Sequence, residues 1–341
     1  MKIKNIILLF TALLVNTEAS YSCSRFTYTA PENTVITGRS MDWMEDLKSD
    51  IWAFPAGITK VGGKAQNSVK WKSKYGSVIA TAYNLATADG INSKGLNANL
   101  LYLSTSDYGK NDPKHYNISV YNWAQFVLDN YATVDEVVKG LNQQQFNMLA
   151  PPLPNGMIPT VHLAVTDPSG DNAVFEYIDG KLVTHHGKQF TVMTNEPAYD
   201  KQLALTDYWK KLKGEFLPGT GEPEDRFVRA SYYLSAAVQT TSTQKSVATI
   251  FSIIRNLSVP IIAKTTDRPN VASTIWRSVS DLKNKIYFFE NTDRPNIFWV
   301  DLNKLNLSEG APVKKLPLTN NEIYAGEVSR NFVNSQAFIA P

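Results

Sequence analysis

Residues 20–25 of the chain read Ser20-Tyr21-Ser22-Cys23-Ser24-Arg25, and they contain the single cysteine among 341 residues. This cysteine follows a short apolar stretch near the start of the chain, and a β-rich run begins directly after it. One cysteine can form neither an internal disulfide nor a zinc cluster. The reason for its position must therefore be sought in the residues on either side of it.

The first 22 residues have the layout of a secretory signal peptide. Lys2 and Lys4 precede the apolar run 6–15, and small residues follow up to Ser22. The run is too short for a membrane-spanning helix, which needs about 20 apolar residues. A buried N-terminal helix is the alternative to the signal peptide. We therefore expect a periplasmic or secreted protein without stable membrane insertion, with a single domain over residues 23–341.

Two cleavage sites fit this signal peptide. A cut after Ser22 has small residues at the last and the third-last position, and it leaves Cys23 as the first residue. A cut after Ala19 would leave residues 20–22 as a short propeptide. Lipidation of Cys23 is disfavoured because residues 20 and 21 lack the aliphatic and small side chains of that signal. A buried, unreactive cysteine is a further alternative.

Composition excludes some classes of protein. Apolar residues make up 43% and charged residues 19% of the chain, which is typical of a globular protein with a sizeable core. The formal charge of +3, from 34 basic and 31 acidic residues, is too small to indicate nucleic-acid binding without a basic cluster.

The loop 150–156 is rich in proline and could be a domain linker, but we favour a surface loop within one domain.

Hydrophobic periodicity predicts antiparallel sheets with helices packed on them. Strands are expected at 25–29, 34–39, 69–75, 161–166, 173–178, 275–290 and 297–302, several of them in hairpins with typical turn residues. Helical spacing of apolar residues occurs in three stretches. The first has Val120, Trp123, Ala124, Val127 and Leu128. The second has Phe227, Ala230, Leu234 and Ala237, and the third has Val247, Ile250, Phe251 and Ile254. Thr133 and Glu136 form a capping box that predicts another helix start.

Several standard catalytic motifs are absent from the sequence. There is no His-Glu-x-x-His, no phosphate-binding Gly-Lys-Ser/Thr loop and no Gly-x-Ser-x-Gly. The four histidines lack the spacing of helical metal ligands, so we expect structural or surface roles for them, and nothing singles out a Ser-His-Asp triad. They are His115, His162, His185 and His186.

Cleavage before Cys23 would give that residue two reactive groups. In reference peptides the α-amine titrates near pH 7.7 to 8 and the thiol near 8.5, so the amine can take the thiol proton near neutral pH. The thiolate can then attack a carbonyl, and the amine can return the proton to the leaving group. Such a site also needs a nearby cation, an anchor for the amine and hydrogen-bond donors for the oxyanion.

The residues that follow Cys23 resemble the choloylglycine hydrolase family, whose members include bile salt hydrolases and penicillin V acylases. Residues 38–43 read Gly-Arg-Ser-Met-Asp-Trp, which places an arginine 16 and an aspartate 19 residues after Cys23, as in that family. Further blocks match in order at 88–96 (Ala-Asp-Gly-Ile-Asn-Ser-Lys-Gly-Leu), 193–197 (Met-Thr-Asn-Glu-Pro), 217–219 (Leu-Pro-Gly) with 226–229 (Arg-Phe-Val-Arg), and 274–281. The resemblance covers residues 23 to about 305.

The resemblance implies a catalytic role for each matching residue. Cys23 would be the nucleophile and, through its amine, the general base. Arg39 would stabilise the thiolate and the developing charge, and Asp42 would hold the α-amine. Asn195 would donate its side-chain amide to the oxyanion, and Arg226 would support the charges. Without the resemblance, the arginines would be read as surface ion-pair residues and Asn195 as a turn residue.

Three aromatic or apolar residues near the nucleophile are candidates for substrate binding. Tyr102 falls where bile salt hydrolases of the family typically carry Asn and penicillin V acylases carry Tyr. Trp43 and Met41 are expected to line an apolar acyl pocket with it, although core packing is an alternative for Tyr102 and Met41.

The family also implies a fold and an activity. We expect an α+β fold, the αββα sandwich of N-terminal nucleophile hydrolases, with two stacked antiparallel sheets between helices. The expected activity is hydrolysis of a linear amide beside a bulky apolar acyl group through an acyl-thioester, with no metal or organic cofactor. The signal peptide is typical of the exported, Gram-negative members, which favour penicillin V and N-acyl homoserine lactones. A bile salt hydrolase is the alternative, a non-catalytic secreted binding protein is another, and a homotetramer is expected.

Overall fold

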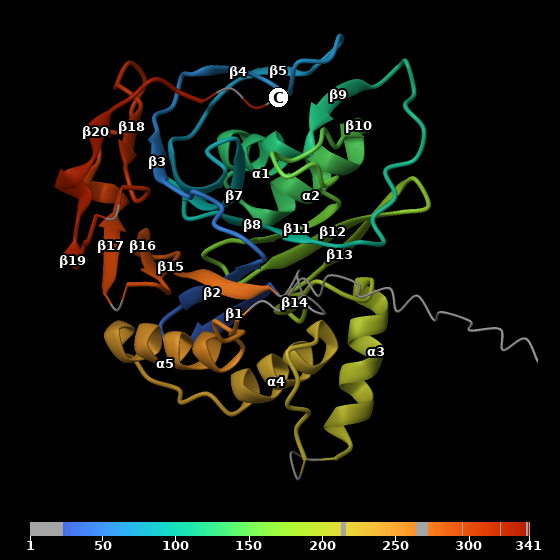
Figure 1. Cartoon of the computed structure of the whole chain (residues 1–341), viewed down its shortest axis with the longest axis vertical. Helices are drawn as coiled ribbons and strands as arrows, with labels where there is room; N and C mark the ends of the chain where they lie inside the picture. Colours follow the sequence, from blue (N-terminus) through green and yellow to red (C-terminus); the bar gives the residue numbers. More distant parts are fainter. Residues whose placement is uncertain are drawn as a thin grey trace, which may run out of the picture.

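The computed structural model describes residues 23–212, 216–263, 272–294, 296–320, 322–338 and 340. The expected signal peptide at 1–22, with its possible propeptide 20–22, lies outside the described residues. The described residues form four layers, in which helices cover the outer faces of two stacked sheets (Figure 1). The predicted αββα sandwich is therefore confirmed.

The first sheet contains the strand that starts beside Cys23. Its strands, in spatial order, are β14 (Val192–Thr194), β1 (Ser24–Ala30), β2 (Thr34–Trp43), β15 (Ser273–Asp281), β16 (Ile286–Asn291), β17 (Ile297–Asp301) and β19 (Gly326–Glu327). Neighbours are antiparallel except for β17 and β19. Strands β1 and β2 form the predicted hairpin, in which Ser24 pairs with Ser40 and Ala30 with Thr34. This register places the end of β2 beside Cys23.

The second sheet is larger and stacks on the first. Its order is β13 (Lys181–His186), β12 (Asn172–Ile178), β11 (Val161–Thr166), β8 (Asn97–Tyr102), β7 (Ala86–Asn92), β6 (Ser77–Ala82), β3 (Ile51–Phe54), β18 (Lys314–Leu316) and β20 (Val333–Asn334). Two small sheets pair β4 (Thr59–Val61) with β5 (Lys70–Lys72) and β9 (Tyr116–Ser119) with β10 (Phe146–Leu149). The strand expected at 69–75 is thus limited to three residues, with its lysines exposed and Trp71 buried.

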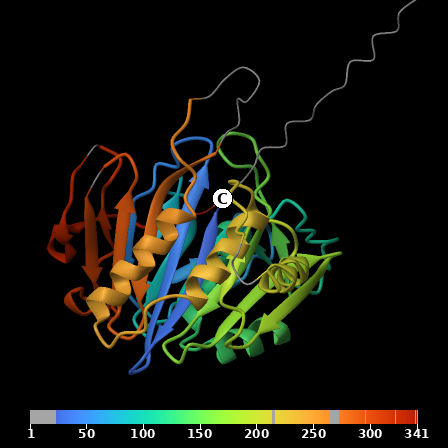
Figure 2. The ribbon, with the colours of Figure 1, turned by 90° about the horizontal axis from the view of Figure 1, so that it is seen from below.

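Two helices pack on the second sheet, and three cover the first (Figures 1 and 2). They are α1 (Val120–Asn130) and α2 (Val134–Gln143), and then α3 (Tyr199–Lys210), α4 (Pro223–Ser235) and α5 (Thr243–Asn256), with short 3₁₀ turns at Leu302–Lys304 and Ser329–Asn331. The predicted helix start is confirmed, because the Thr133 hydroxyl accepts from the Glu136 amide at 3.2 Å, but the return bond of the capping box is displaced by one residue, since the Glu136 carboxylate accepts from the Ala132 amide at 2.7 Å.

The sequence pattern did not predict α3. Its buried residues are Tyr199, Gln202 and Thr206, so its inner face lacks the apolar periodicity on which such predictions depend. Its first residue is also not capped locally. The Glu176 carboxylate of β12 accepts from the Tyr199 amide at 3.0 and 3.2 Å. This helix therefore begins where a distant strand supplies an acceptor for its N-terminus.

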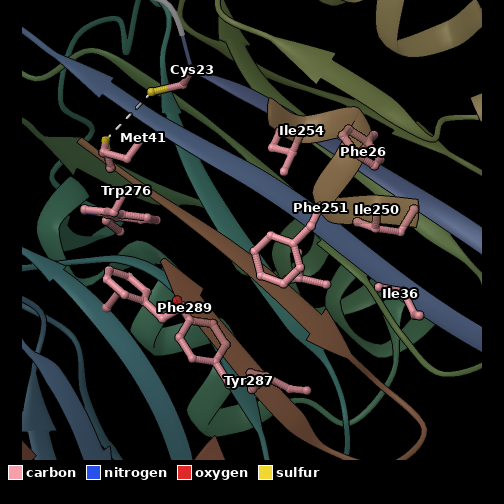
Figure 3. Close-up of a cluster of buried hydrophobic side chains, with 14 of the residues drawn as sticks. Cys23, Phe26, Ile36, Met41, Ile250, Phe251, Ile254, Trp276, Tyr287 and Phe289 are labelled. Carbon is pink, nitrogen blue, oxygen red and sulfur yellow. Dashed lines mark hydrogen bonds between the residues drawn. The ribbon is translucent and has the colours of Figure 1, made fainter. Parts of the chain in front are cut away.

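The apolar core includes the neighbourhood of Cys23 (Figure 3). Helix α5 packs on β2, with Ile250, Phe251 and Ile254 among the buried residues of this core, and helix and strand approach each other closely at Gly38. A Cβ atom on Gly38 would lie 2.7 Å from Ile250 Cγ2 and 3.0 Å from Phe26 Cζ. The absence of a side chain at position 38 lets the helix lie against the strand that carries Arg39.

We expect Gly38→Ala to lower the free energy of unfolding by about 1 to 3 kcal/mol, because the added methyl group overpacks this contact. Urea denaturation followed by tryptophan fluorescence measures the change. Gly219→Ala is the matched control, because a Cβ there meets no atom of the described residues within 4 Å. An unchanged midpoint for Gly38→Ala would contradict the packing argument.

Candidate active site

The Cys23 thiol lies between the ends of β1 and β2. Its side chain is buried, and Sγ is 3.8 Å from Met41 Sδ (Figure 3). The backbone amide of Asp42 donates to Sγ at 3.5 Å. The pairing of Ser24 with Ser40 brings these residues together, so the 19-residue spacing between Cys23 and Asp42 is a consequence of the hairpin.

Burial raises the pKa of the Cys23 thiol, because the charged form loses its water. The Arg39 charge opposes this shift, and the Asp42 charge adds to it. The net direction is upward. The thiol is therefore neutral near pH 7 in this state, and it needs a base before it can react as a nucleophile.

Arg39 links the two sheets. It stands on β2, and its guanidinium donates to the carbonyls of Ala88 and Leu100 on the second sheet at 2.8 and 2.6 Å. It also lies over the Trp276 ring, 4.8 Å from the ring centre. These contacts fix a buried positive charge near Cys23.

Asp42 is a fully buried carboxyl group at the end of β2. It accepts from the Thr274 hydroxyl at 2.5 Å and from the Ser40 hydroxyl at 3.4 Å. Burial raises the pKa of Asp42 to about 6, and the Arg226 charge and the Thr274 hydrogen bond limit that rise. The group titrates close to neutral pH, where many catalytic acids and bases are found.

Arg226 joins α4 to the start of β1. Its guanidinium donates to the Cys23 carbonyl at 2.7 Å, to the Ser24 hydroxyl at 2.5 Å and to Asn195 Oδ1 at 3.3 Å. The Asn195 amide group donates to the Tyr102 carbonyl at 2.7 Å. The arginine thus orients the asparagine so that its amide nitrogen points toward the second sheet.

An apolar cavity of about 80 Å³ adjoins the thiol. Cys23, Arg39 and the three residues expected to bind substrate, Met41, Trp43 and Tyr102, are part of its wall. The rings of Trp43 and Tyr102 meet edge to face with centres 6.2 Å apart. Other lining residues are Leu47, Ala82, Tyr83, Ala86, Thr87, Ala88, Leu100, Leu101, Val120, Tyr121, Leu153, Pro159 and Val161.

The structure thus brings together residues from five separate parts of the chain. It also adds Ser24, which contacts Arg226, Thr274, which contacts Asp42, and Tyr83 in the cavity wall. Thr274 begins one of the blocks that resemble the family, so that resemblance was a signal for it. Tyr83 had no such signal, because its partners lie far from it in sequence.

Two histidines form carboxylate pairs away from the thiol. His162 Nδ1 is 3.0 Å from Glu176, and His186 Nε2 is 2.8 Å from Asp171. Among the residues that the structure describes, no three His, Cys, Asp or Glu side chains are placed to hold a metal ion. Within the same residues, no helix has the length and apolar character needed to cross a bilayer.

Comparison with known proteins gives consistent results. The profile of a family described as linear amide C–N hydrolases, choloylglycine hydrolase family, matches residues 23–315. A penicillin V acylase of Pectobacterium atrosepticum is 45% identical over 353 residues, which cover 96% of this chain and 94% of that protein. A bile salt hydrolase/transferase of Clostridium perfringens is 26% identical, with 86% and 95% covered. The structure of a penicillin V acylase from Agrobacterium tumefaciens superposes with a TM-score of 0.87 at 46% identity, with 94% and 99% covered.

The raised pKa of Asp42 makes a prediction about stability and pH. A carboxyl group that binds its proton more tightly in the folded state stabilises that state at low pH. This contribution is complete below the unfolded pKa of 3.8 and is lost as the pH rises through the folded pKa of about 6. Relative to Asp42→Asn, the free energy of unfolding should therefore fall by about 2 kcal/mol between pH 4 and pH 7, because part of the contribution is already lost at pH 4.

Urea denaturation at several pH values measures this difference. The protein must retain Ser22, because a free amine at Cys23 would add a charge beside Asp42. Parallel pH profiles for the wild type and Asp42→Asn would show that the carboxyl group has an ordinary pKa.

Proposed function

Because the chain belongs to the choloylglycine hydrolase family and is a hydrolase of linear amide C–N bonds, we propose that it is an exported amidohydrolase of the penicillin V acylase type with Cys23 as nucleophile. The observation that carries this proposal is the position of the thiol at an apolar cavity beside Arg39. An acyl group held in that cavity places its carbonyl carbon within reach of Sγ.

The first step requires a base. Removal of the residues before Cys23 frees its α-amine, which takes the thiol proton. The thiolate then attacks the amide carbon, a C–S bond forms and the carbonyl electrons move to oxygen. Asp42 holds the resulting ammonium group, as the family resemblance implies, and the Arg39 charge favours the thiolate over the thiol. The amine therefore removes the obstacle that burial imposes on the thiol.

In this mechanism, Asn195 stabilises the oxyanion. A primary amide carries two N–H hydrogens, and the bond to the Tyr102 carbonyl uses one of them. The second serves the oxyanion together with the backbone N–H of Tyr102, as the family resemblance implies. Arg226 holds Asn195 in this orientation through Oδ1.

Collapse of the tetrahedral intermediate completes acyl transfer. The C–N bond breaks, the ammonium group gives its proton to the leaving amine and the acyl group stays on sulfur as a thioester. Water then attacks the thioester with the α-amine as general base. The C–S bond breaks, the acid leaves and the thiol regains its proton.

The cavity supports the choice of substrate class. Its volume of about 80 Å³ is roughly half of the about 150 Å³ cavity that takes up benzene. It can therefore enclose only part of an acyl group, and one flat ring or one extended chain exceeds this space less than four fused steroid rings do. Phenoxyacetyl amides such as penicillin V fit this description, N-acyl homoserine lactones are a second candidate class, and bile salts are the less favoured alternative.

Export, assembly and cofactor use complete the proposal. Residues 1–22 have the layout of a signal peptide, which supports a periplasmic or secreted location. A homotetramer stays a prediction that light scattering tests directly. The proposed chemistry uses side chains and the α-amine, without a metal or organic cofactor. A non-catalytic binding protein on the same scaffold would have lost catalytic residues, whereas Cys23, Arg39, Asp42, Asn195 and Arg226 are all retained.

We expect Cys23→Ala to abolish hydrolysis of penicillin V, and Cys23→Ser to retain at most a small fraction of it, because a hydroxyl group is a weaker nucleophile. The panel consists of penicillin V, an N-acyl homoserine lactone and glycocholate. Intact mass spectrometry of the active protein should give a chain that starts at Cys23. Full activity in either variant, or an active chain with another first residue, rules out the nucleophile assignment.

We expect Asn195→Ala to lower kcat about 100-fold to 1,000-fold, because one oxyanion donor is lost. KM should change much less. Asn320→Ala, at an exposed turn, serves as the control and should leave both constants unchanged. Loss of substrate binding with an unaltered kcat would argue against the oxyanion role.

A further inference from the structure

Tyr83 lines the cavity but has no part in the proposed chemistry. Its hydroxyl group accepts from Trp43 Nε1 at 3.0 Å and from Asn155 Nδ2 at 3.4 Å, and it donates to the Glu45 carboxylate. A phenol offers one hydrogen and two acceptor positions. These three bonds use that capacity completely, so the hydroxyl group is a junction with three arms.

The three arms come from two segments that are far apart in sequence. Trp43 ends β2, the strand that also carries Arg39, Met41 and Asp42, and Glu45 follows in the next turn. Asn155 lies in the proline-rich loop 150–156, which precedes β11. The junction thus connects the strand with the proposed catalytic residues to a loop more than one hundred positions away in sequence.

The backbone around Tyr83 holds the junction in place. Tyr83 and Asn84 form the tight turn between β6 and β7, with φ values of 54° and 51°. The Tyr83 amide donates to the Leu47 carbonyl at 2.6 Å. The Asn84 side chain donates to the Lys48 carbonyl at 3.2 Å and to Asp50 at 3.0 Å. These bonds connect the turn to the segment after β2.

The loop 150–156 borders the same cavity. Leu153 of this loop is part of the cavity wall, and so is Tyr121 of α1. The Tyr121 hydroxyl donates to the Pro151 carbonyl at 3.0 Å. One tyrosine thus holds the beginning of the loop, and Tyr83 holds the Asn155 side chain farther along.

We propose that Tyr83 is a specificity-determining residue, whose hydroxyl junction fixes the Trp43 indole and the loop 150–156 as walls of the acyl cavity and so sets the preference for bulky acyl groups. This inference rests on the proposed function. A bulky acyl group contacts the walls that the junction holds. A short acyl group does not extend to them, so its binding does not depend on the junction.

The charge state of the junction is stable across the neutral range. Burial, with the neighbouring Glu45 carboxylate, raises the pKa of Tyr83 above its ordinary value. The hydroxyl group therefore keeps its proton, and it continues to donate to Glu45 while it accepts from the other two partners.

Tyr83→Phe tests the proposal, because it retains the ring and removes the three bonds. Phenoxyacetyl and propanoyl amides of the same amine, 6-aminopenicillanic acid, are compared. We expect KM for the phenoxyacetyl amide to rise about threefold to tenfold, which corresponds to the net value of about one hydrogen bond, because only part of the loss of the three bonds affects the bound acyl group. The kcat for this substrate should stay within about twofold, and both constants for the propanoyl amide should be unchanged.

Matched variants separate the junction from a general loss of packing. Tyr28→Phe removes a hydroxyl group that donates to the Val238 carbonyl, outside the cavity. This variant should leave KM and kcat unchanged for both amides. Asn155→Ala breaks one arm and should raise KM for the phenoxyacetyl amide by a smaller factor. Glu45→Gln preserves an acceptor and should be close to wild type, whereas Glu45→Ala should resemble Asn155→Ala.

The outcomes distinguish this inference from the proposed function. If the wild type hydrolyses neither amide, the proposed function fails. If the wild type is active and Tyr83→Phe leaves the ratio of the two kcat/KM values unchanged, the junction has no role in selectivity and the inference is overturned. An equal loss for both substrates overturns it too. If Tyr83→Phe does not fold, the ratio measured for Asn155→Ala decides.

Binding provides a readout that does not require turnover. In a Cys23→Ser background, phenoxyacetate titration followed by tryptophan fluorescence should show weaker binding when Tyr83→Phe is added. Equal affinity with and without Tyr83→Phe would contradict the proposed role of the hydroxyl group in shaping the cavity.

Discussion

The buried guanidinium of Arg226 is the constraint on which the rest of the site depends. A charge removed from water must be compensated by hydrogen bonds and by opposite charge. Arg226 finds acceptors at the Cys23 and Gly221 carbonyls, the Ser24 hydroxyl and Asn195, with the Asp42 charge nearby. Burial lowers its pKa to about 10, so it remains charged at neutral pH. Its acceptors are thereby held in one arrangement, which joins α4, the start of β1 and the segment after β14.

The second constraint is the contact between the two sheets. Arg39 reaches from the first sheet to carbonyls of the second, and Arg25 does the same through the side chain of Asn99. Asn99 in turn donates to Asp89, whose carboxylate also accepts from Tyr287 of the first sheet at 2.7 Å. Polar links of this kind fix how the sheets lie on one another, whereas apolar contacts alone would permit sliding. The cavity beside Cys23 lies where both sheets contribute residues, so its shape depends on that alignment.

The sequence predicted those elements whose signals are local. The five apolar positions of α1 are all buried, and the hairpin of β1 and β2 has its turn where expected. Helix α3 was missed because Gln202 and Thr206 occupy its buried face and because Glu176 caps it from another strand. The strands β18 to β20 have two or three residues each and depend on distant partners. The five proposed catalytic residues were found through the family resemblance. Hydrogen bonds between remote segments produce no regular spacing of residues in the sequence, so periodicity could not predict them. The Tyr83 junction is of the same kind and had no motif to reveal it.

The buried, fully assembled setting of Cys23 has a consequence for timing. The chain still carries Ser22 ahead of Cys23. Even so, the Asp42 amide donates to the Cys23 thiol, Arg226 donates to the Cys23 carbonyl and the Arg39 charge acts on the thiol. On the proposed mechanism, such a precursor is latent for a chemical reason and not for a conformational one, because its nitrogen is an amide that cannot take a proton. Latency then ends with the hydrolysis of one peptide bond, a change that the protein does not reverse. On this mechanism, folding and the onset of activity are separate events, and cleavage before Cys23 determines when and where the second occurs.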